Sequence, residues 1–245
     1  MKARGGSFEF APIGVVRTPF KDKFGIPRQP GLVSQAKGII KISDDPDLKT
    51  ALRSLEEFSH LWIVFVFHEH GGRNWKPSIR PPRLGGNRKV GVLASRSPHR
   101  PNPIGLSAVI LERVDFDAEG GPEIHVAGVD LLDETPVLDI KPYIPYADSI
   151  PEANAGWASE EIPRYPVKFT HEVEALILKA DPKGEQGLRR LIIEVLELDP
   201  RPAYQKRQLP VGDPKSVGLK FGFDLLGHDV KYEVREDHFL VHNLL

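Results

Sequence analysis

Short apolar runs, separated by turns rich in Gly and Pro, fill the first 150 residues of the chain. Runs of four to eight β-branched and aromatic residues bounded by such turns are typical of β-strands. The run at residues 61–67 is apolar at every position, which predicts a central strand buried on both faces. The full set of predicted strands is residues 8–17, 38–42, 61–67, 90–94, 105–116, 123–129 and 136–140.

One amphipathic helix interrupts this series. In residues 46–55, the apolar side chains of Leu48, Ala51, Leu52 and Leu55 recur at helical spacing, and residues 43–45 supply a cap before Pro46. Many strands with a single helix and long connections favour a closed or nearly closed β-barrel.

The pattern changes after residue 163. A strand at 165–170 precedes helical patterns at 171–179 and 185–198, and further strands follow at 217–223, 230–234 and 239–241. The sequence therefore predicts a mainly β protein with three parts. These are a barrel domain at residues 1–150, a linker at 151–164 that is rich in Ala, Pro and Glu, and a small α+β domain at 165–245.

Composition narrows the protein class. The hydrophobic share of 40% and the charged share of 27% are ordinary for a soluble globular protein, and no apolar run approaches the ~20 residues of a spanning helix. The absence of Cys excludes disulfides, thiolate catalysis and Cys-ligated metal centres. Neither a secretory signal nor a transit peptide is visible at the start, so a cytoplasmic protein without a membrane partner is expected.

The net charge of −1 conceals a strong segregation of basic residues. No acidic residue occurs between Glu69 and Glu112. A surface that gathers the basic residues would suit phosphates, although the same pattern also fits a solvated face. The basic residues of the two enriched stretches are Arg17, Lys21, Lys23, Arg28, Lys37, Lys41, Arg73, Lys76, Arg80, Arg83, Arg88, Lys89, Arg96 and Arg100.

The connection at residues 95–104 is a candidate binding loop. Arg96 and Arg100 lie four residues apart on a turn stiffened by Pro98, Pro101 and Pro103. Guanidinium groups held in fixed geometry suit carboxylates or phosphates. Alternatively, the loop is a structural turn whose arginines pair with the acidic stretch downstream.

Two further groups of polar residues follow predicted strands. Extension of the strand at 61–67 would place His68 and His70 on one face, as in a cupin metal site, but no carboxylate ligand follows before Glu112, so we predict no metal. The turn at 130–133 carries Asp130 and Asp133, which suit either turn formation or hydrogen bonds to a ribose, an amine or an ammonium group. No Rossmann, P-loop or nucleophile-elbow motif is present, and these residues alone do not name a reaction.

Several longer motifs resemble those of one family, the TrmO-type tRNA methyltransferases, whose first domain is a TsaA-like β-barrel. The resemblance implies transfer of a methyl group from S-adenosylmethionine to N6 of the threonylcarbamoyladenosine 3′ of the anticodon. It also implies a homodimer that binds the tRNA anticodon arm, with the cofactor near the subunit contact. The motifs are Pro-Arg-Gln-Pro-Gly-Leu at 27–32, Phe-Ser-His-Leu-Trp at 58–62, Arg-Pro-Pro-Arg-Leu-Gly-Gly-Asn at 80–87, Arg-Pro-Asn-Pro-Ile-Gly at 100–105, Asp-Ile-Lys-Pro-Tyr at 139–143 and Leu-Asp-Pro-Arg-Pro-Ala-Tyr at 198–204.

Site residues follow from the same resemblance. We hypothesise that Arg96 holds the methionine carboxylate while Asp130 or Asp133 meets the ammonium group or the ribose. Asp199 and Tyr204, with Arg201, are candidates for the catalytic contact with the target nucleotide. The implied cofactor positions are Pro27, Arg28, Gln29, His68, Glu69, Arg96, Leu106, Asp130, Leu131, Leu132 and Asp133.

Two other classes stay open at this point. One is a non-catalytic barrel that binds RNA or a nucleotide as an adaptor, and the other is a metal-dependent, cupin-like enzyme. An adaptor would show no binding of S-adenosylmethionine, and elemental analysis would reveal a metal.

Overall fold

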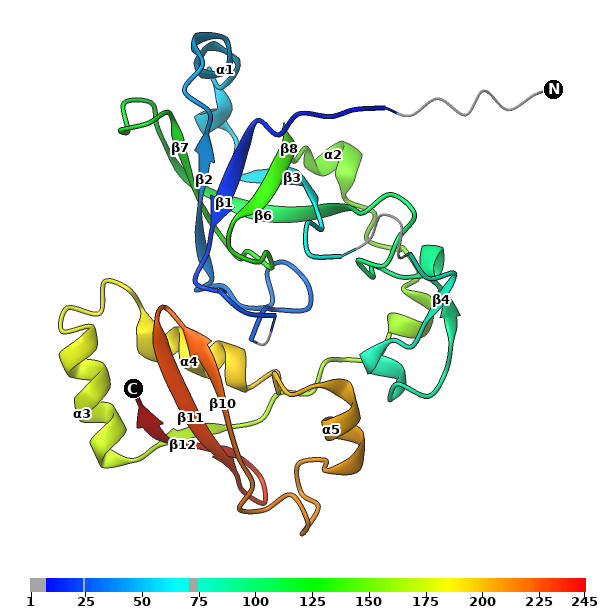
Figure 1. Cartoon of the computed structure of the whole chain (residues 1–245), viewed down its shortest axis with the longest axis vertical. Coiled ribbons are helices and arrows are strands. Elements are labelled where there is room, and N and C mark those ends of the chain that lie inside the picture. Colours follow the sequence, from blue (N-terminus) through cyan, green and yellow to red (C-terminus); the bar gives the residue numbers. More distant parts are fainter. Residues whose placement is uncertain (1–7, 24, 71–74) are drawn as a thin grey trace.

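A computed structural model describes residues 8–23, 25–70 and 75–245 (Figure 1). It contains a closed six-stranded barrel, a four-stranded sheet and a two-stranded hairpin. The predicted mainly β fold with a barrel is confirmed. Arg73 and the first residues of the connection at 71–89 lie outside the described residues. Within the described residues, no helix is long and apolar enough to cross a membrane.

The barrel is antiparallel throughout, with strand order β1-β2-β7-β6-β3-β8. It closes because β8 also pairs with β1, with Gly14 opposite Val137. Alternate side chains point inward, and Ile40, Ile63 and Val126 are fully buried in the core. The strands are β1 (Gly14–Arg17), β2 (Lys37–Ile42), β3 (His60–Val66), β6 (Ile104–Asp115), β7 (Glu123–Ala127) and β8 (Thr135–Pro142).

Three strand predictions need correction. The strand predicted at 8–17 begins only at Gly14, since Pro12 has no N–H to donate to a neighbouring strand. The strand at 61–67 is buried on one face alone, because its outward residues lie on the outside of the barrel. The strand predicted at 90–94 is reduced to β5 (Val90–Gly91), which pairs with β4 (Ser78–Ile79) and leads into the 3₁₀ turn η4 (Val92–Ala94).

The predicted helix at 46–55 is shorter than expected. Helix α1 (Pro46–Ala51) begins as predicted, with the Asp45 side chain accepting a 2.7 Å hydrogen bond from the N–H of Asp47. It ends early because Ser54 adopts a left-handed conformation with φ of 64°, after which the chain forms the 3₁₀ turn η1 (Leu55–Glu57).

The C-terminal region forms a sheet in the order β10-β11-β12-β9, covered by helices. Helix α4 buries Leu188, Leu191, Ile192 and Val195, as its spacing predicted. The short helix α5 was not predicted. The elements are β9 (Val167–Phe169), α3 (His171–Ala180), α4 (Leu188–Leu196), α5 (Ala203–Gln208), β10 (Lys220–Leu225), β11 (His228–Val234) and β12 (Phe239–Leu244). Between the two regions lie α2 (Pro145–Asp148) and the 3₁₀ turn η5 (Gly156–Ala158).

Direct contacts join the barrel to the C-terminal region. The hydroxyl of Ser34, in the β1–β2 connection, donates to Glu194 of α4 at 2.9 Å. Arg207 of α5 donates to the carbonyl of Gly85 at 2.8 Å, next to the 3₁₀ turn η3 (Pro82–Leu84). The two regions therefore meet on the side where the barrel faces α4 and α5 (Figure 1).

The pairing of Gly105 with Phe65 tests the packing of the barrel. A Cβ atom at Gly105 would lie 2.2 Å from Cζ of the buried Phe65 ring, so we expect Gly105→Ala to lower the free energy of unfolding by about 1–3 kcal/mol. Gly91→Ala is the matched control, because nothing lies within 4 Å of a Cβ there. Equal urea midpoints for the two variants would contradict this packing.

Candidate cofactor and substrate site

The alternating strand directions place a set of connections at one end of the barrel. Because β1, β3 and β7 run in the same direction, the segments that follow them open at the same end. The residues that begin β2, β6 and β8 lie there as well. Every predicted cofactor position falls in or next to these segments, so the topology brings the predicted positions to one end.

A polar cluster forms at this end around Asp130. Arg96 donates to the side-chain oxygen of Gln29 at 2.5 Å, and the hydroxyl of Ser107 donates to the Asp130 carboxylate at 2.6 Å. The positive charge of Arg96 acts on Asp130. The cluster thus draws on the β1–β2 connection, the binding loop, the start of β6 and the β7–β8 connection.

Asp130 is an unusual carboxyl group. Loss of hydration raises its pKa from the ordinary 3.8 to about 6, although the hydrogen bond from Ser107 and the charge of Arg96 oppose that shift. At neutral pH the group is therefore an ionised carboxylate that water solvates poorly. Such a carboxylate is suited to a cationic or hydrogen-bond-donating ligand.

The rest of the turn at 130–133 is committed to the fold. Asp133 is buried, accepts a 2.8 Å hydrogen bond from the N–H of Thr18 and pairs with Lys21. Leu131 belongs to the core, and the carbonyl of Leu132 accepts from Thr135 at 2.7 Å. Asp130 and Asp133 were the two predicted partners for the ammonium group or the ribose. Of the two, only Asp130 has its carboxylate in the cluster, because that of Asp133 bonds to Thr18 and Lys21.

The segment after β3 differs from the prediction. Strand β3 ends at Val66 and a turn follows, so His68 and His70 do not continue a strand, and the prediction that they share a strand face is wrong. The ring of His70 instead packs edge-on against His99, with centroids 5.2 Å apart, and Glu69 lies 3.7 Å from Lys23. In the part of the chain that the structure describes, no group of three His, Asp or Glu residues is arranged to hold a metal.

The two arginines of the binding loop have different roles. Arg100 donates to the carbonyl of Ser95 at 2.6 Å and thus braces its own loop. It pairs with a carbonyl rather than with the acidic stretch downstream that the alternative interpretation required. Arg96 faces Gln29 and Asp130 and is therefore the arginine available to a ligand.

Asp199 and Arg201 form a buried ion pair in the C-terminal region. Two hydrogen bonds of 2.7 and 2.8 Å join them, and the Arg201 side chain is also within 6 Å of the rings of Phe221 and Phe239. Burial opposes the charge on Arg201, but the hydrogen bonds and charge of Asp199 outweigh it, so the net pKa of Arg201 is raised. Only 5% and 2% of their surfaces are exposed, so the pair stabilises the fold in this conformation. Arg201 also lines the pocket described below, and the predicted contact of the two residues with the target nucleotide stays a prediction.

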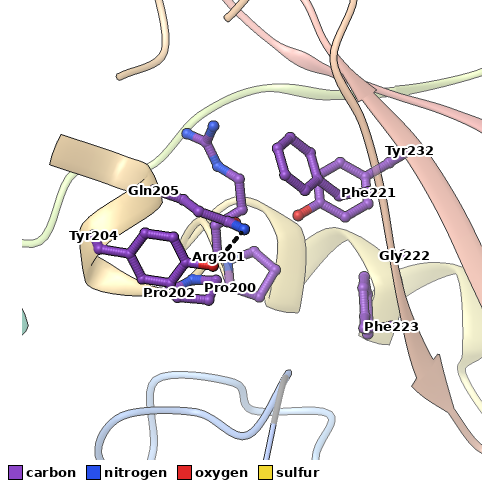
Figure 2. Close-up of a pocket in the computed structure, with 9 residues that line it drawn as sticks. All are labelled: Pro200, Arg201, Pro202, Tyr204, Gln205, Phe221, Gly222, Phe223 and Tyr232. Atoms are coloured by element: carbon purple, nitrogen blue, oxygen red, sulfur yellow. Dashed lines mark hydrogen bonds between the residues drawn. The ribbon is translucent and has the colours of Figure 1, made fainter. Parts of the chain in front are cut away.

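Tyr204 lies at a pocket of about 190 Å³ between α5 and β10 (Figure 2). Its side chain is 55% exposed, and its hydroxyl oxygen accepts a 3.1 Å hydrogen bond from Gln205. The lining residues are Pro200, Arg201, Pro202, Tyr204, Gln205, Phe221, Gly222, Phe223 and Tyr232. Sequence reasoning missed Gln205, which follows the motif at 198–204 directly, and the β10 aromatic residues, whose alternation resembles that of any half-buried strand.

The β1–β2 connection links the pocket to the Asp130 cluster. A Cβ atom at Gly25 would lie 3.1 Å from the Phe223 ring, so Gly25 lies against the pocket wall. Four residues later, Gln29 binds Arg96. A chain of four residues spans at most about 14 Å, so the pocket and the cluster are near neighbours.

Comparison with known families matches both regions of the chain. The tRNA-methyltransferase O N-terminal domain matches residues 15–149, and the TrmO C-terminal domain matches residues 162–245. The chain belongs to the TrmO family. The resemblance inferred from the motifs is thereby confirmed.

Individual proteins are similar to this chain over nearly its whole length. The tRNA (adenine(37)-N6)-methyltransferase of Escherichia coli K12 is 49% identical over 96% of this chain and 97% of the relative. A putative S-adenosylmethionine-dependent methyltransferase, RcsF, of Pseudomonas aeruginosa is 44% identical over 91% of this chain and 90% of its own length. The crystal structure of TrmO from Pseudomonas aeruginosa superposes with a TM-score of 0.78 at 33% identity, covering 100% of this chain and 99% of the other.

The raised pKa of Asp130 predicts a measurable effect on stability. The folded state holds this proton more tightly than the unfolded state, so the wild type loses stability as pH rises from about 4 to about 6. Asp130→Asn keeps an acceptor for Ser107 but cannot ionise. We therefore expect it to be more stable than the wild type by about 1–3 kcal/mol at pH 7, with the difference vanishing near pH 4. Urea unfolding of both proteins at the two pH values measures this, and a pH-independent difference would refute it.

Proposed function

We propose that this chain is an S-adenosylmethionine-dependent tRNA methyltransferase that methylates N6 of adenosine 37, in its threonylcarbamoyl-modified form, 3′ of the anticodon. The observation that carries this proposal is the 49% identity, over 96% of the chain, to an Escherichia coli protein named tRNA (adenine(37)-N6)-methyltransferase. Identity that extends over both regions supports a shared reaction rather than a shared barrel alone. A cytoplasmic location follows from the proposed substrate.

The Asp130 cluster fits the cofactor. The methionine part of S-adenosylmethionine carries a carboxylate and an ammonium group, and Arg96 and Asp130 offer the opposite charges side by side. The poorly hydrated carboxylate of Asp130 would recover favourable interactions by meeting a cation. Gln29 holds Arg96 in place, and the exposed Leu106 offers an apolar surface next to them.

The reaction requires little acid–base catalysis from the protein. When bound, the cofactor supplies a methyl group on a positively charged sulfur, which is already activated toward displacement by a nitrogen. The protein needs to orient the adenosine and exclude water. Pro98, Pro101 and Pro103 restrict the binding loop, so less entropy is lost when it is held against a ligand.

A division of labour between the regions follows. The barrel, residues 1–150, would bind the cofactor, residues 151–164 would link the regions, and residues 165–245 would contact the target nucleotide through Tyr204 and its pocket. The tRNA anticodon arm would meet the exposed basic residues of the connection before β6. These include Arg80, Arg88 and Lys89, whose side chains are open to solvent.

A homodimer is the expected assembly. The outward face of β6 exposes Ile104, Leu106 and Ile110, and the outward residues of the neighbouring β3 strand, Trp62 and Val64, are apolar as well. A continuous apolar patch on a barrel wall is typical of a subunit contact, and a two-fold axis would pair the patch with its own copy. Leu106 belongs both to this patch and to the cofactor positions, which supports a cofactor bound near the subunit contact.

The proposed activity is tested by mass spectrometry of nucleosides. We expect tRNA that carries threonylcarbamoyladenosine to gain one labelled methyl group when incubated with the protein and labelled S-adenosylmethionine. Arg96→Ala should weaken cofactor binding by roughly 10- to 100-fold in calorimetry, since a charged contact is lost. Lys49→Ala, on the exposed side of α1, is the control and should bind as the wild type does. Absence of cofactor binding by the wild type would favour the adaptor, and a stoichiometric metal would favour the cupin-like enzyme.

The subunit contact makes a separate prediction. The wild type should sediment at twice the mass of one chain, whereas Ile110→Arg should sediment as a monomer because the guanidinium would be buried without a partner. Leu178→Arg is the control, as Leu178 is 65% exposed on α3 of the C-terminal region. A wild type that sediments as a monomer, or a dimer that survives Ile110→Arg, would disprove the proposed contact.

A further inference from the structure

One buried hydroxyl group lines the pocket between α5 and β10 without a partner in the protein. Tyr232 of β11 is only 2% exposed, and Figure 2 shows its hydroxyl oxygen pointing from β11 into the pocket. Among the described residues, the hydroxyl of Tyr204 is bonded to Gln205 at 3.1 Å, whereas that of Tyr232 forms no hydrogen bond. A buried hydroxyl is expected to have a partner, and for Tyr232 one can arrive through the pocket.

Neighbouring aromatic rings fix the direction of this hydroxyl. The Tyr232 ring has its centroid 5.8 Å from that of Phe221, which lies opposite it in the β10–β11 register. The rings of Phe223 and Phe239 pack edge-on against it, with centroids 6.1 and 5.5 Å away. Because the ring is packed on several sides, the hydroxyl is held in place before a ligand arrives.

The pocket offers this hydroxyl in neutral surroundings. Of its nine lining residues, Arg201 carries a charge, and two hydrogen bonds of 2.7 and 2.8 Å pair it with Asp199. Loss of hydration raises the pKa of Tyr232, so its phenol stays protonated at neutral pH and can donate. A neutral, aromatic wall favours an uncharged flat group over a phosphate or a carboxylate.

The size of the pocket fits a single ring system. Its volume of about 190 Å³ is below the roughly 300 Å³ of pockets that take a drug-sized molecule. Enzymes that modify a nucleobase take the base out of its stack, hold it between aromatic and apolar side chains, and contact its edge through hydrogen bonds. Phe221 and Phe223 supply such side chains here, and the Tyr232 hydroxyl supplies the donor.

We propose that Tyr232 is a specificity-determining residue whose hydroxyl donates a hydrogen bond to a ring nitrogen of the target adenine, held in the pocket between α5 and β10. This inference rests on the proposed function and adds a residue outside the motif at 198–204. The phenylalanine rings would hold the faces of any base, whereas the hydroxyl would favour a base with a nitrogen lone pair at the contacted position. A base with a C–H there would leave the hydroxyl without a partner.

S-adenosylmethionine also contains an adenine ring, which must be distinguished from that of the substrate. All the predicted cofactor positions lie in the barrel, whereas all nine residues that line the pocket belong to the C-terminal region. The adenine of the substrate is accordingly the one assigned to the pocket, and the experiment measures cofactor binding separately.

The experiment removes one atom from each side of the proposed hydrogen bond. Tyr232→Phe deletes the hydroxyl and keeps the ring. Tyr165→Phe is the matched control, because the Tyr165 ring also packs against Phe239, with centroids 5.8 Å apart, but lies outside the pocket lining. The substrates are anticodon stem-loops with threonylcarbamoyladenosine at the target position, or with one of three analogues in which N1, N3 or N7 of the ring is replaced by C–H.

We expect Tyr232→Phe to lower kcat/KM on the natural stem-loop by roughly three- to tenfold, the effect of losing one hydrogen bond. One of the three analogues should lower kcat/KM of the wild type by the same factor, and Tyr232→Phe should not discriminate against that analogue. The melting temperature should be no lower than that of the wild type, because the deleted oxygen has no partner in the protein. The Kd for S-adenosylmethionine should not change, and Tyr165→Phe should behave as the wild type does.

Four results would overturn the proposal. These are a Tyr232→Phe variant as active as the wild type, one that loses further activity on all three analogues, one with a lower melting temperature, which would show that the hydroxyl has a partner within the fold, and one with a weaker Kd for S-adenosylmethionine, which would assign the pocket to the cofactor. A wild type that methylates none of the stem-loops would instead refute the proposed function.

Discussion

Closure of the barrel by hydrogen bonds between β1 and β8 is the constraint on which the site depends. With six antiparallel strands closed into a ring, every second connection must emerge at the same end. Segments distant in sequence, at residues 27–29, 96 and 130, therefore converge without any dedicated scaffold. The same end of the barrel faces helices α4 and α5 of the C-terminal region (Figure 1).

Charge organises this end of the molecule at two levels. Asp133 and Asp199 have their cationic partners within the fold and hold the chain in shape, as do the carbonyl contacts of Arg100. Asp130 is different, because its neighbours Ser107 and Arg96 only partly offset the cost of removing its carboxylate from water. Groups left in that condition are the ones expected to meet a ligand. Asp133 and Asp199 thus stabilise the fold through their ion pairs, whereas Asp130 is left to interact with a ligand.

Sequence reasoning succeeded where a local pattern determines the structure. Alternation at 38–42 and 123–129 and the helical spacing of 188–195 placed β2, β7 and α4, and the motifs identified the family. It failed where the outcome depends on neighbours. The outward face of β3 is apolar although it lies outside the barrel core, so its sequence could not be distinguished from that of a fully buried strand. Asp130 and Asp133 lie in one turn, and only their three-dimensional surroundings determine that Asp133 bonds to the backbone of β1's C-terminal neighbour Thr18 while Asp130 lies in the polar cluster. Helix α5 is only six residues long and directly follows Pro202, so its sequence has too little periodicity for the helix to be predicted.

The bond between Arg207 and the Gly85 carbonyl has a mechanical consequence. Gly86 has φ of 69°, and a Cβ there would lie 3.1 Å from the Arg207 guanidinium, so the loop at residues 80–89 lies against helix α5. The loop at residues 80–89 therefore helps to fix the position of helix α5, which carries the pocket residue Tyr204. Homologous enzymes in which this loop differs in length or sequence should differ in their selectivity for RNA, even when every pocket residue is unchanged.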